Sequence, residues 1–310
     1  MKKEFSCANV IVTFNRKRKL LKAINSLLKQ SLLPKYIIII DNNSTDGTKA
    51  FLNEKKILSN KRIKYFKLKK NLGGSGGFRF AVEKAKNFNV DWIGFGDDDA
   101  YYQQDFWKKI AKVSSERPNI KAFTGTVKLN DGRIDISHRI FINDWGMLRY
   151  KYIPKKYYKK NFFVDMFTFV GSVVNTEIIK KIGNIKSEYF IWIDDLEFSV
   201  RVREQTKIIN VTKALVLHDT NQSAMDFKNN PKADWRYYYE VRNKIDMCAC
   251  HGKSFRRNLY PVAILIKNIL KFFSSKYKGH KIYDLRQTLN AIYDAKHKKF
   301  GKSLKYNPNN

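Results

Sequence analysis

The chain has 310 residues, of which 43% are hydrophobic and 14% aromatic, and its 61 Lys and Arg against 28 Asp and Glu give a formal charge of +33. A chain of this length and apolar content can bury one substantial core with a smaller appended part, which excludes a largely disordered protein. Its charge predicts an anionic partner such as nucleic acid, a lipid surface or a phosphorylated substrate.

The first hundred residues alternate between buried strands and amphipathic helices. In chain order, the pattern predicts a strand in "CANVIVTF", a helix in "RKRKLLKAINSLLKQ", a strand in "YIIIID", a short helix near 49–55, a strand in "RIKYFKL", a helix over 77–88 and a strand in "VDWIGFGD". These strands are too apolar to have a wet face. The alternation therefore predicts an α/β fold with a mostly parallel, Rossmann-like sheet covered by helices on both sides.

Acidic residues follow two of the predicted strands. Asp41 ends the second strand, and Asp97, Asp98 and Asp99 end the fourth. In open parallel sheets the ligand crevice lies outside the carboxyl ends of the strands. Adjacent carboxylates raise one another's pKa unless a cation sits among them, and oxygen ligands of this kind suit Mg²⁺ or Mn²⁺. A solvated acidic turn, or a cap for a helix in "AYYQQDFWKKI", is the alternative.

Four glycines lie within five residues in "NLGGSGGFRF", directly before the third predicted helix. Glycines permit a phosphate, a ribose or another segment to approach the backbone closely. The G-x-G-x-x-G pattern is not matched, because Arg79 stands where the third glycine would be, and the chain has no P-loop. This disfavours a dehydrogenase and a P-loop NTPase. The alternative to a ligand is a glycine hinge that packs the helix against the sheet.

The cysteines and the N-terminal stretch predict a cytoplasmic protein. Cys7, Cys248 and Cys250 are too few for a disulfide framework, and His251 beside the last two leaves too few ligands for zinc. Residues 1–19 lack the apolar region and cleavage site of a signal peptide, and no apolar run reaches the length of a bilayer span.

Together the motifs resemble glycosyltransferase family 2, the inverting enzymes of GT-A fold. The order and approximate spacing of that family are matched by "VIVTFNR", "IIIIDNNSTDGT", "NLGGSGGF" and "GFGDDDA". The glycine segment is most similar to the bacterial galactofuranosyltransferase-like branch and its cell-surface polysaccharide relatives. The likeness covers roughly residues 7–245 and continues through "FVGSVVNTEIIKKIGNI", "YFIWIDDLEFSVRVRE", "ALVLHDT" and "YYYEVRNK".

The resemblance implies a donor site at the ends of the strands. It assigns Asp41 to the nucleotide base, with Thr13 and Arg16 lining the same pocket. The implied donor-binding set is completed by Asn71, Gly73, Gly74, Gly77, Arg79 and Asp98. The implied ligands of Mn²⁺ or Mg²⁺ are Asp97, Asp99 and His218. From the sequence alone, His218 would be an ordinary histidine after a strand.

The segment "WIDDLE" supplies the implied catalytic groups. An acceptor hydroxyl needs a carboxylate to take its proton, and the family pattern makes Asp195 this base and Asp194 a ligand of acceptor or donor hydroxyls. Trp192 would stack on the sugar, and Glu197 is a weaker candidate on the acceptor side. The alternative is that an aspartate only caps the helix "DDLEFSVRVRE".

We expect a catalytic domain over 1–245, divided into a nucleotide-binding half over 1–100 and an acceptor half over 101–245. Basic amphipathic helices follow over 246–310. The last sixty residues, 251–310, carry fourteen Lys and Arg and two Asp. Such a helix can lie on an anionic membrane surface or pack on the catalytic domain or a second protomer.

The implied reaction is metal-dependent, inverting transfer from a UDP-sugar, with UDP-galactofuranose favoured and dTDP-rhamnose the alternative. The implied acceptor is a saccharide or a polyprenyl-diphosphate-linked glycan of cell-surface polysaccharide synthesis, reached peripherally at the inner face of the plasma membrane. A nucleic-acid-binding protein on an α/β scaffold is the alternative class, because "LRYKYIPKKYYKK" over 148–160 mixes basic and aromatic residues. The acidic motifs repel phosphates without metal, so no nucleic acid is expected.

Overall fold

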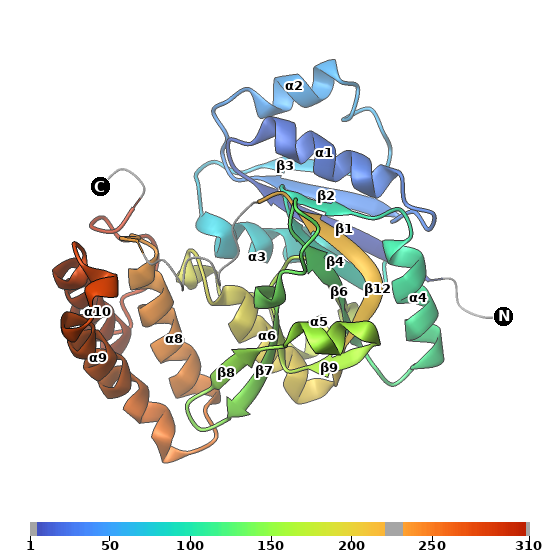
Figure 1. The fold of residues 1–310 in the computed structure, drawn as a ribbon. Coiled ribbons are helices and arrows are strands. Elements are labelled where there is room, and N and C mark those ends of the chain that lie inside the picture. Colours follow the sequence, from blue (N-terminus) through green and yellow to red (C-terminus); the bar gives the residue numbers. More distant parts are fainter. Residues whose placement is uncertain (1–4, 221–231, 308–310) are drawn as a thin grey trace.

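A nine-stranded sheet forms the centre of the protein in this computed structural model, which describes residues 5–220 and 232–307 (Figure 1). The strands follow one another across the sheet in the order β3 (Ile63–Lys67), β2 (Tyr36–Asp41), β1 (Cys7–Thr13), β4 (Trp92–Asp97), β11 (Ser172–Asn175), β6 (Ala122–Lys128), β12 (Ile208–His218) and β5 (Ala100–Tyr102), and β9 (Phe162–Val164) also pairs with β12.

Most of the sheet is parallel. β3, β2, β1 and β4 pair in parallel, β11 is inserted antiparallel between β4 and β6, and β12 again runs parallel to β6. The strands that end in Asp41, Asp97 and His218 therefore all point to one edge of the sheet. This confirms the predicted α/β class and the predicted Rossmann-like arrangement of the first strands.

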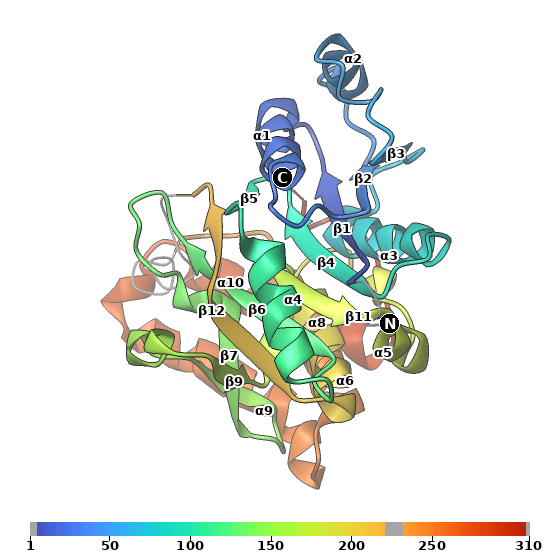
Figure 2. The same cartoon turned by 90° about the vertical axis from the view of Figure 1, so that its right-hand side faces the viewer.

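Helices cover both faces of the sheet. The four isoleucines of β2 alternate between the faces, so that Ile37 and Ile39 belong to one buried cluster and Ile38 and Ile40 to the other. The first face is covered by α1 (Lys17–Leu28), α2 (Thr48–Glu54) and α4 (Phe106–Glu116), and the second by α3 (Gly73–Lys86), α5 (Thr176–Ile182) and α6 (Asp194–Gln205). Figure 2 shows α4 lying over β6 and β12. Each fully buried isoleucine contributes about 1.5–3 kcal/mol to folding.

The third helix begins earlier than the sequence predicted. We expected residues 77–88, but α3 begins at Gly73, so that all four glycines lie in its first turn and a half. The side-chain oxygen of Asn71 accepts the amide proton of Gly73 at 2.8 Å and helps to start the helix. Glycine is a poor helix former in isolation, which is why the sequence indicated a loop here.

A small sheet and three C-terminal helices complete the structure. The small sheet has the order β10 (Met166–Phe167), β7 (Arg139–Asp144) and β8 (Arg149–Tyr152). The helices α8 (Tyr237–His251), α9 (Tyr260–Leu270) and α10 (Lys281–Lys296) pack on one another beside the sheet domain (Figure 1). The expected boundary between 245 and 246 falls inside α8. In the described part of the chain, no helix is long and apolar enough to cross a membrane.

Candidate active site

The predicted acidic residues meet at the carboxyl edge of the sheet. Thr13 ends β1 opposite Asp41 of β2, and Asp97 ends β4 opposite Val12. His218 ends β12 and pairs with Ala100 of β5, directly after the acidic triplet. The fold therefore brings together residues that are up to 205 positions apart in the chain.

Two basic residues balance the acidic triplet. Arg16 Nη1 lies 3.2 Å from Asp98 Oδ1 and 2.9 Å from Asp99 Oδ2, and Lys19 Nζ lies 3.7 Å from Asp99 Oδ2. Thr13 Oγ1 donates a hydrogen bond of 2.7 Å to Asp98 Oδ2. Arg16, which we predicted in the nucleotide pocket, thus pairs with the carboxylates in this structure. Its side chain stays 54% exposed, which leaves it accessible to an anionic ligand.

The carboxyl groups of the triplet have different proton affinities. Burial, together with the charge of Asp99, raises the pKa of Asp97 to about 7, and burial raises that of Asp98 to about 6. Burial also acts on Asp99, but the hydrogen bond and charge of His218 and the charge of Arg16 hold its pKa below the usual value. His218 Nε2 lies 3.5 Å from Asp99 Oδ1.

This donor set fits a divalent cation. Ionised Asp97 and Asp98 lack full compensation of charge in their buried setting, and a cation would supply it. Carboxylate oxygens with one imidazole nitrogen suit Mn²⁺ well and Mg²⁺ through the oxygens. Of the predicted ligands, His218 and Asp99 lie within 3.5 Å of each other. In the described part of the chain, Asp97 is not part of a group of three residues whose ligand atoms all lie close together, so the metal role of Asp97, Asp99 and His218 stays a prediction.

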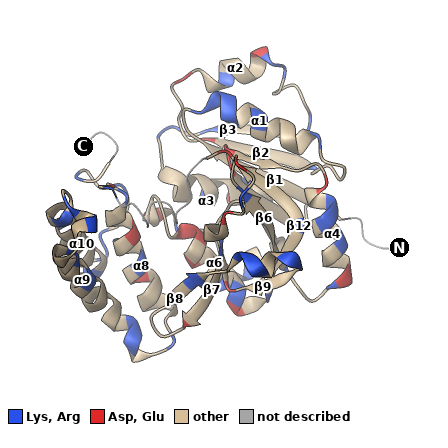
Figure 3. Ribbon diagram, in the orientation of Figure 1, with Lys and Arg blue, Asp and Glu red and all other residues tan. Residues whose placement is uncertain are grey.

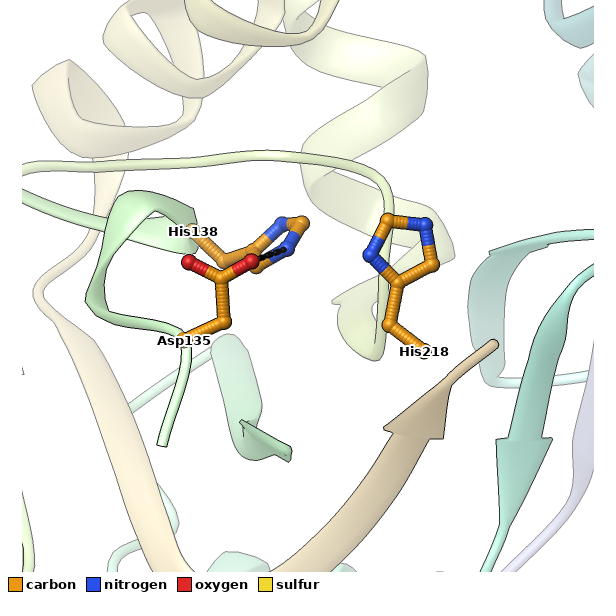
Figure 4. Close-up of side chains that lie close together, drawn as sticks. All are labelled: Asp135, His138 and His218. Atoms are coloured by element: carbon orange, nitrogen blue, oxygen red, sulfur yellow. Dashed lines mark ion pairs between the residues drawn. The ribbon is translucent and has the colours of Figure 1, made fainter. Parts of the chain in front are cut away.

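His218 also lies close to two residues that the sequence did not indicate, Asp135 and His138. Asp135, His138 and His218 offer ligand atoms within 4.8 Å of one another (Figure 4). His138 Nε2 is 3.3 Å from Asp135 Oδ2, and His138 Nδ1 is 2.6 Å from Thr168 Oγ1. Burial lowers the pKa of His138 to about 4, so its imidazole is neutral at neutral pH. The signal in the sequence was the three-residue spacing in "RIDISHR", but it falls in a short 3₁₀ turn that no periodic pattern predicts.

The expected base-binding residue, Asp41, is fully buried. Its carboxylate accepts hydrogen bonds from the amide of Ser44, at 2.7 Å, and from the hydroxyl of Tyr65. These contacts fix the turn that follows β2. Next to it, Asn42 accepts the amide proton of Leu72 at 2.9 Å and donates to the carbonyl of Gly73 at 2.9 Å. Asn42 therefore fastens the start of α3 to the end of β2.

The glycines of α3 differ in what they approach. Gly73 has φ +73°, and a Cβ there would overlap the carbonyl oxygen of Phe190; a Cβ on Gly77 would lie 2.5 Å from Val12 Cγ1. Gly74 has nothing within 4 Å of such an atom. Packing of the helix thus accounts for Gly73 and Gly77, and Gly74 is left open to a ligand. Arg79 pairs with Glu83 and donates to the carbonyl of Ile185, so its role in donor binding stays a prediction.

The predicted catalytic pair begins α6. Ile193 is the N-cap, so Asp194 and Asp195 occupy the first two helical positions and the alternative of an aspartate N-cap is wrong. Burial raises the pKa of Asp194 to about 6. Burial and the charge of Asp194 raise the pKa of the partly accessible Asp195 well above its usual value, and the charge of Asp97 adds to this shift. The charge of the acidic triplet therefore contributes to the proton affinity of Asp195.

Two further predicted acceptor residues have other contacts. The Arg236 guanidinium lies 4.8 Å from the centre of the partly exposed Trp192 ring. Glu197 is fully buried, and its carboxylate lies 2.8 Å from Arg201 Nη2 and 3.0 Å from His251 Nε2. These ion pairs favour a structural role for Glu197, and its acceptor role stays a prediction.

Comparison with known proteins places this geometry in a family. Residues 9–183, more than half of the chain, match the family described as Glycosyl transferase family 2. The chain belongs to glycosyl transferase family 2. It is therefore a glycosyltransferase, and the sequence resemblance is confirmed at the level of the family.

This glycosyltransferase is similar to two curated enzymes over part of its length. It is 30% identical over 96 residues to galactofuranosyltransferase GlfT1 of Mycolicibacterium smegmatis, an alignment that covers 31% of this chain and 30% of that protein. GlfT1 of Mycobacterium tuberculosis strain H37Rv gives the same identity over the same number of residues, covering 30% of each chain. The chain thus matches less than a third of the length of these relatives.

Solved structures share the GT-A fold with the glycosyltransferase. GalNAc-T7 with UDP, GalNAc and Mn²⁺ superposes with a TM-score of 0.66 at 15% identity, covering 96% of this chain and 58% of that chain. S. aureus TarS 1–349 in complex with UDP-GlcNAc gives a TM-score of 0.60 at 16% identity, covering 94% and 80%. At these identities the likeness shows the fold alone.

Proposed function

We propose that this protein transfers a sugar from a UDP-sugar, UDP-galactofuranose favoured, to a saccharide or lipid-linked acceptor with inversion at the anomeric carbon. The observation that carries the proposal is the placement of Asp194 and Asp195 at the start of α6, where the charge of Asp97 reaches Asp195. Asp195 thus supplies a candidate general base, and the acidic triplet supplies a candidate metal-diphosphate site.

The donor is held at the carboxyl edge of the sheet. Asp41 and Thr13 line the base and ribose side, Arg16 moves from the carboxylates to the diphosphate, and the open face of Gly74 admits the sugar nucleotide. Asp97, Asp99 and His218 would hold Mn²⁺ or Mg²⁺, which neutralises the charge that develops on the leaving phosphate. GalNAc-T7, whose structure contains UDP and Mn²⁺, supports this by analogy of fold.

Asp195 acts on the acceptor. Its carboxylate takes the proton of the acceptor hydroxyl, whose oxygen forms the new bond to the anomeric carbon as the bond to the diphosphate oxygen breaks on the opposite face. The nucleoside diphosphate leaves with the electron pair. The raised pKa of Asp195 makes it a stronger base than an ordinary aspartate. Asp194 and Trp192 bind the hydroxyls and the face of the sugar.

The donor sugar is proposed from the relatives. The name of GlfT1 supports galactofuranose, and the short alignment keeps dTDP-rhamnose as the alternative. TarS, whose complex contains UDP-GlcNAc, supports uracil as the base. The match to glycosyl transferase family 2 disfavours the alternative of a nucleic-acid-binding protein.

The acceptor is proposed to be presented at an anionic membrane surface, as part of cell-surface polysaccharide synthesis. Side chains along α9 and the turn after it stay exposed although they are large and apolar: Val262 55%, Ile266 52%, Leu270 61% and Phe273 86%. Exposed basic residues accompany them on the C-terminal helices, where Figure 3 shows several blue segments. An apolar face with basic neighbours is typical of a helix that lies in a lipid headgroup region.

Calorimetry tests the donor site directly. UDP, dTDP and GDP are titrated into the protein with and without Mn²⁺, beside a short single-stranded oligonucleotide at 0.15 M salt. We expect UDP to bind only with Mn²⁺. Binding of dTDP instead would favour rhamnose, and binding of the oligonucleotide without any nucleotide diphosphate would overturn the proposal.

A further inference from the structure

The turn that carries the catalytic pair has an unfavourable backbone. Phe190, Trp192 and Ile193 have φ of 66°, 64° and 70°, in the left-handed region that residues with a side chain avoid. Such a conformation persists only where surrounding contacts determine it. Asp194 follows directly, so whatever holds residues 189–193 also sets the position of Asp194 and Asp195.

Helix α8 holds the turn from one side. Asn243, which is fully buried, directs its side-chain nitrogen at three carbonyl oxygens of the turn, those of Tyr189 at 3.1 Å, Ile191 at 3.1 Å and Trp192 at 2.9 Å. Arg242, 1% exposed, donates to the same Tyr189 carbonyl at 3.1 Å and to Asn243 Oδ1 at 3.0 Å. The second bond orients the amide so that its nitrogen faces the turn.

Helix α3 holds the turn from the other side. The amide of Ser75 donates to the carbonyl of Phe190 at 3.2 Å, and Gly73 has no Cβ that would push this carbonyl away. The carbonyls of residues 189 to 192 are therefore all engaged, one by the glycine-rich start of α3 and three by Asn243. One helix belongs to the proposed donor side of the site and the other to the C-terminal helices.

We propose that Arg242 and Asn243 are positioning residues, which set the general base of this glycosyltransferase without touching either substrate. The proposal rests on the proposed function of Asp195. It assigns a role in catalysis to α8, which lies outside the matched segment 9–183. Loss of the Asn243 amide should let the turn relax toward ordinary backbone angles and move the carboxylates, while the donor site at the sheet edge stays in place.

Two variants and one control test this in the full chain. Asn243→Ala removes the amide, and Asn243→Asp keeps the shape but places an acceptor against the three carbonyls. Tyr239→Phe is the control, because Tyr239 is as buried on the same helix and loses only a hydroxyl that bonds to Tyr306 and Ser303. The ring that packs against Phe190 and Arg242 is kept. The readouts are kcat for transfer, calorimetric affinity for UDP with Mn²⁺, and hydrogen exchange of the peptide spanning residues 189–196.

We expect both Asn243 variants to lose about 10- to 100-fold in kcat, as misplacement by about 1 Å does, with UDP affinity unchanged and exchange at 189–196 accelerated. Tyr239→Phe should leave kcat and that exchange at the wild-type values. Wild-type kcat in Asn243→Ala, an equal loss in the control, or failure of both Asn243 variants to fold would overturn the positioning role. If the wild type transfers no sugar, the proposed function fails. Unchanged hydrogen exchange at 189–196 in the Asn243 variants would instead contradict the claim that Asn243 holds the turn.

Discussion

The carboxyl groups of the site differ in the pKa that their surroundings impose. His218 and Arg16 keep Asp99 ionised at neutral pH, as a metal ligand requires. Burial and like charge raise the pKa of Asp194 and Asp195, as a proton acceptor requires. Groups whose environments separate their proton affinities in this way are typical of acid–base chemistry, and the two roles that we assign follow from this separation.

Replacing the proposed general base, Asp195, should stop sugar transfer without lowering the affinity for the donor nucleotide. In Asp195→Asn the amide keeps the size of the side chain but cannot take a proton, so kcat should fall by about 100-fold or more. Affinity for UDP with Mn²⁺ should stay unchanged. The two quantities are measured by transfer kinetics and calorimetry. Wild-type turnover would move the role of base to Asp194.

The same substitution should stabilise the protein in a pH-dependent manner. A carboxyl whose pKa is raised by folding binds its proton more tightly in the folded state, so its contribution to stability falls as pH rises from the ordinary value toward the raised one. Metal-free Asp195→Asn should therefore melt above the wild type at pH 8 and together with it near pH 4. Thermal unfolding with EDTA at both pH values measures this, and a constant difference at both would contradict the shift.

Single residues of the candidate site could be predicted where they directly follow an apolar run that forms a strand. Asp41 and the triplet Asp97 to Asp99 follow apolar runs, and Asp194 and Asp195 were found through the family motif. Asp135, His138 and Asn243 were not assigned a role, because the groups that they meet, His218 and the carbonyls of residues 189–192, lie far away in the chain. A sequence pattern shows which side chains end an element, but not which distant carbonyl or imidazole they will meet.

At the scale of elements, the glycine-rich start of α3 packs closely against neighbouring segments and also leaves one position open to a ligand. Its backbone approaches Phe190 and Val12 closely, and only Gly74 faces open space. The sequence allowed both a ligand and a packing role for these glycines, and it placed the helix start four residues late. The error has a physical source: glycines lower helix propensity, but here contacts from Asn42 and Asn71 fix the first turn.

A pair of alanine substitutions separates the two roles of these glycines. Gly77→Ala places a methyl group 2.5 Å from Val12 Cγ1 and should destabilise the protein by about 1–3 kcal/mol through overpacking. Gly74→Ala meets no atom and should stabilise it by roughly 0.5–1 kcal/mol through helix propensity, while weakening binding of a UDP-sugar. Urea unfolding and calorimetry give both quantities. Equal donor affinity in Gly74→Ala and the wild type would remove Gly74 from the donor site.

At the scale of the whole molecule, the C-terminal segment contacts the segments next to Asp194 and Asp195. His251 Nε2 of α8 lies 3.0 Å from Glu197 Oε1, and the amide of Gly301 donates to the carbonyl of Glu188 at 2.7 Å. Tyr238 of α8 donates to Asp294 of α10 at 2.5 Å, and Tyr239 contacts Tyr306 near the end of the described chain. The composition of 246–310 did not reveal that α8 crosses the expected boundary and reaches the turn before Asp194. Packing on the catalytic domain and the proposed contact with a membrane are compatible, because the membrane would meet the exposed face of these helices.

Point substitutions at exposed side chains of α9 and of the turn after it test the proposed membrane binding and keep the packing of α9 and α10 on α8. Ile266→Glu and Phe273→Glu place charge on side chains that are 52% and 86% exposed, so the fold should keep its melting temperature. Each should weaken binding to vesicles of phosphatidylglycerol by about 10- to 100-fold, since burying the apolar side chain contributes about 1.5–3 kcal/mol.

Phe163→Glu is the matched control, because Phe163 is 57% exposed on β9, away from these helices. It should leave vesicle binding unchanged, and raising the salt concentration should weaken binding of all variants, since the basic residues contribute electrostatically. Co-sedimentation with vesicles at 0.05 and 0.3 M salt measures both effects. If the α9 variants bind like the wild type while salt releases them all, the charge of the chain alone holds it to the surface and α9 has no part in it.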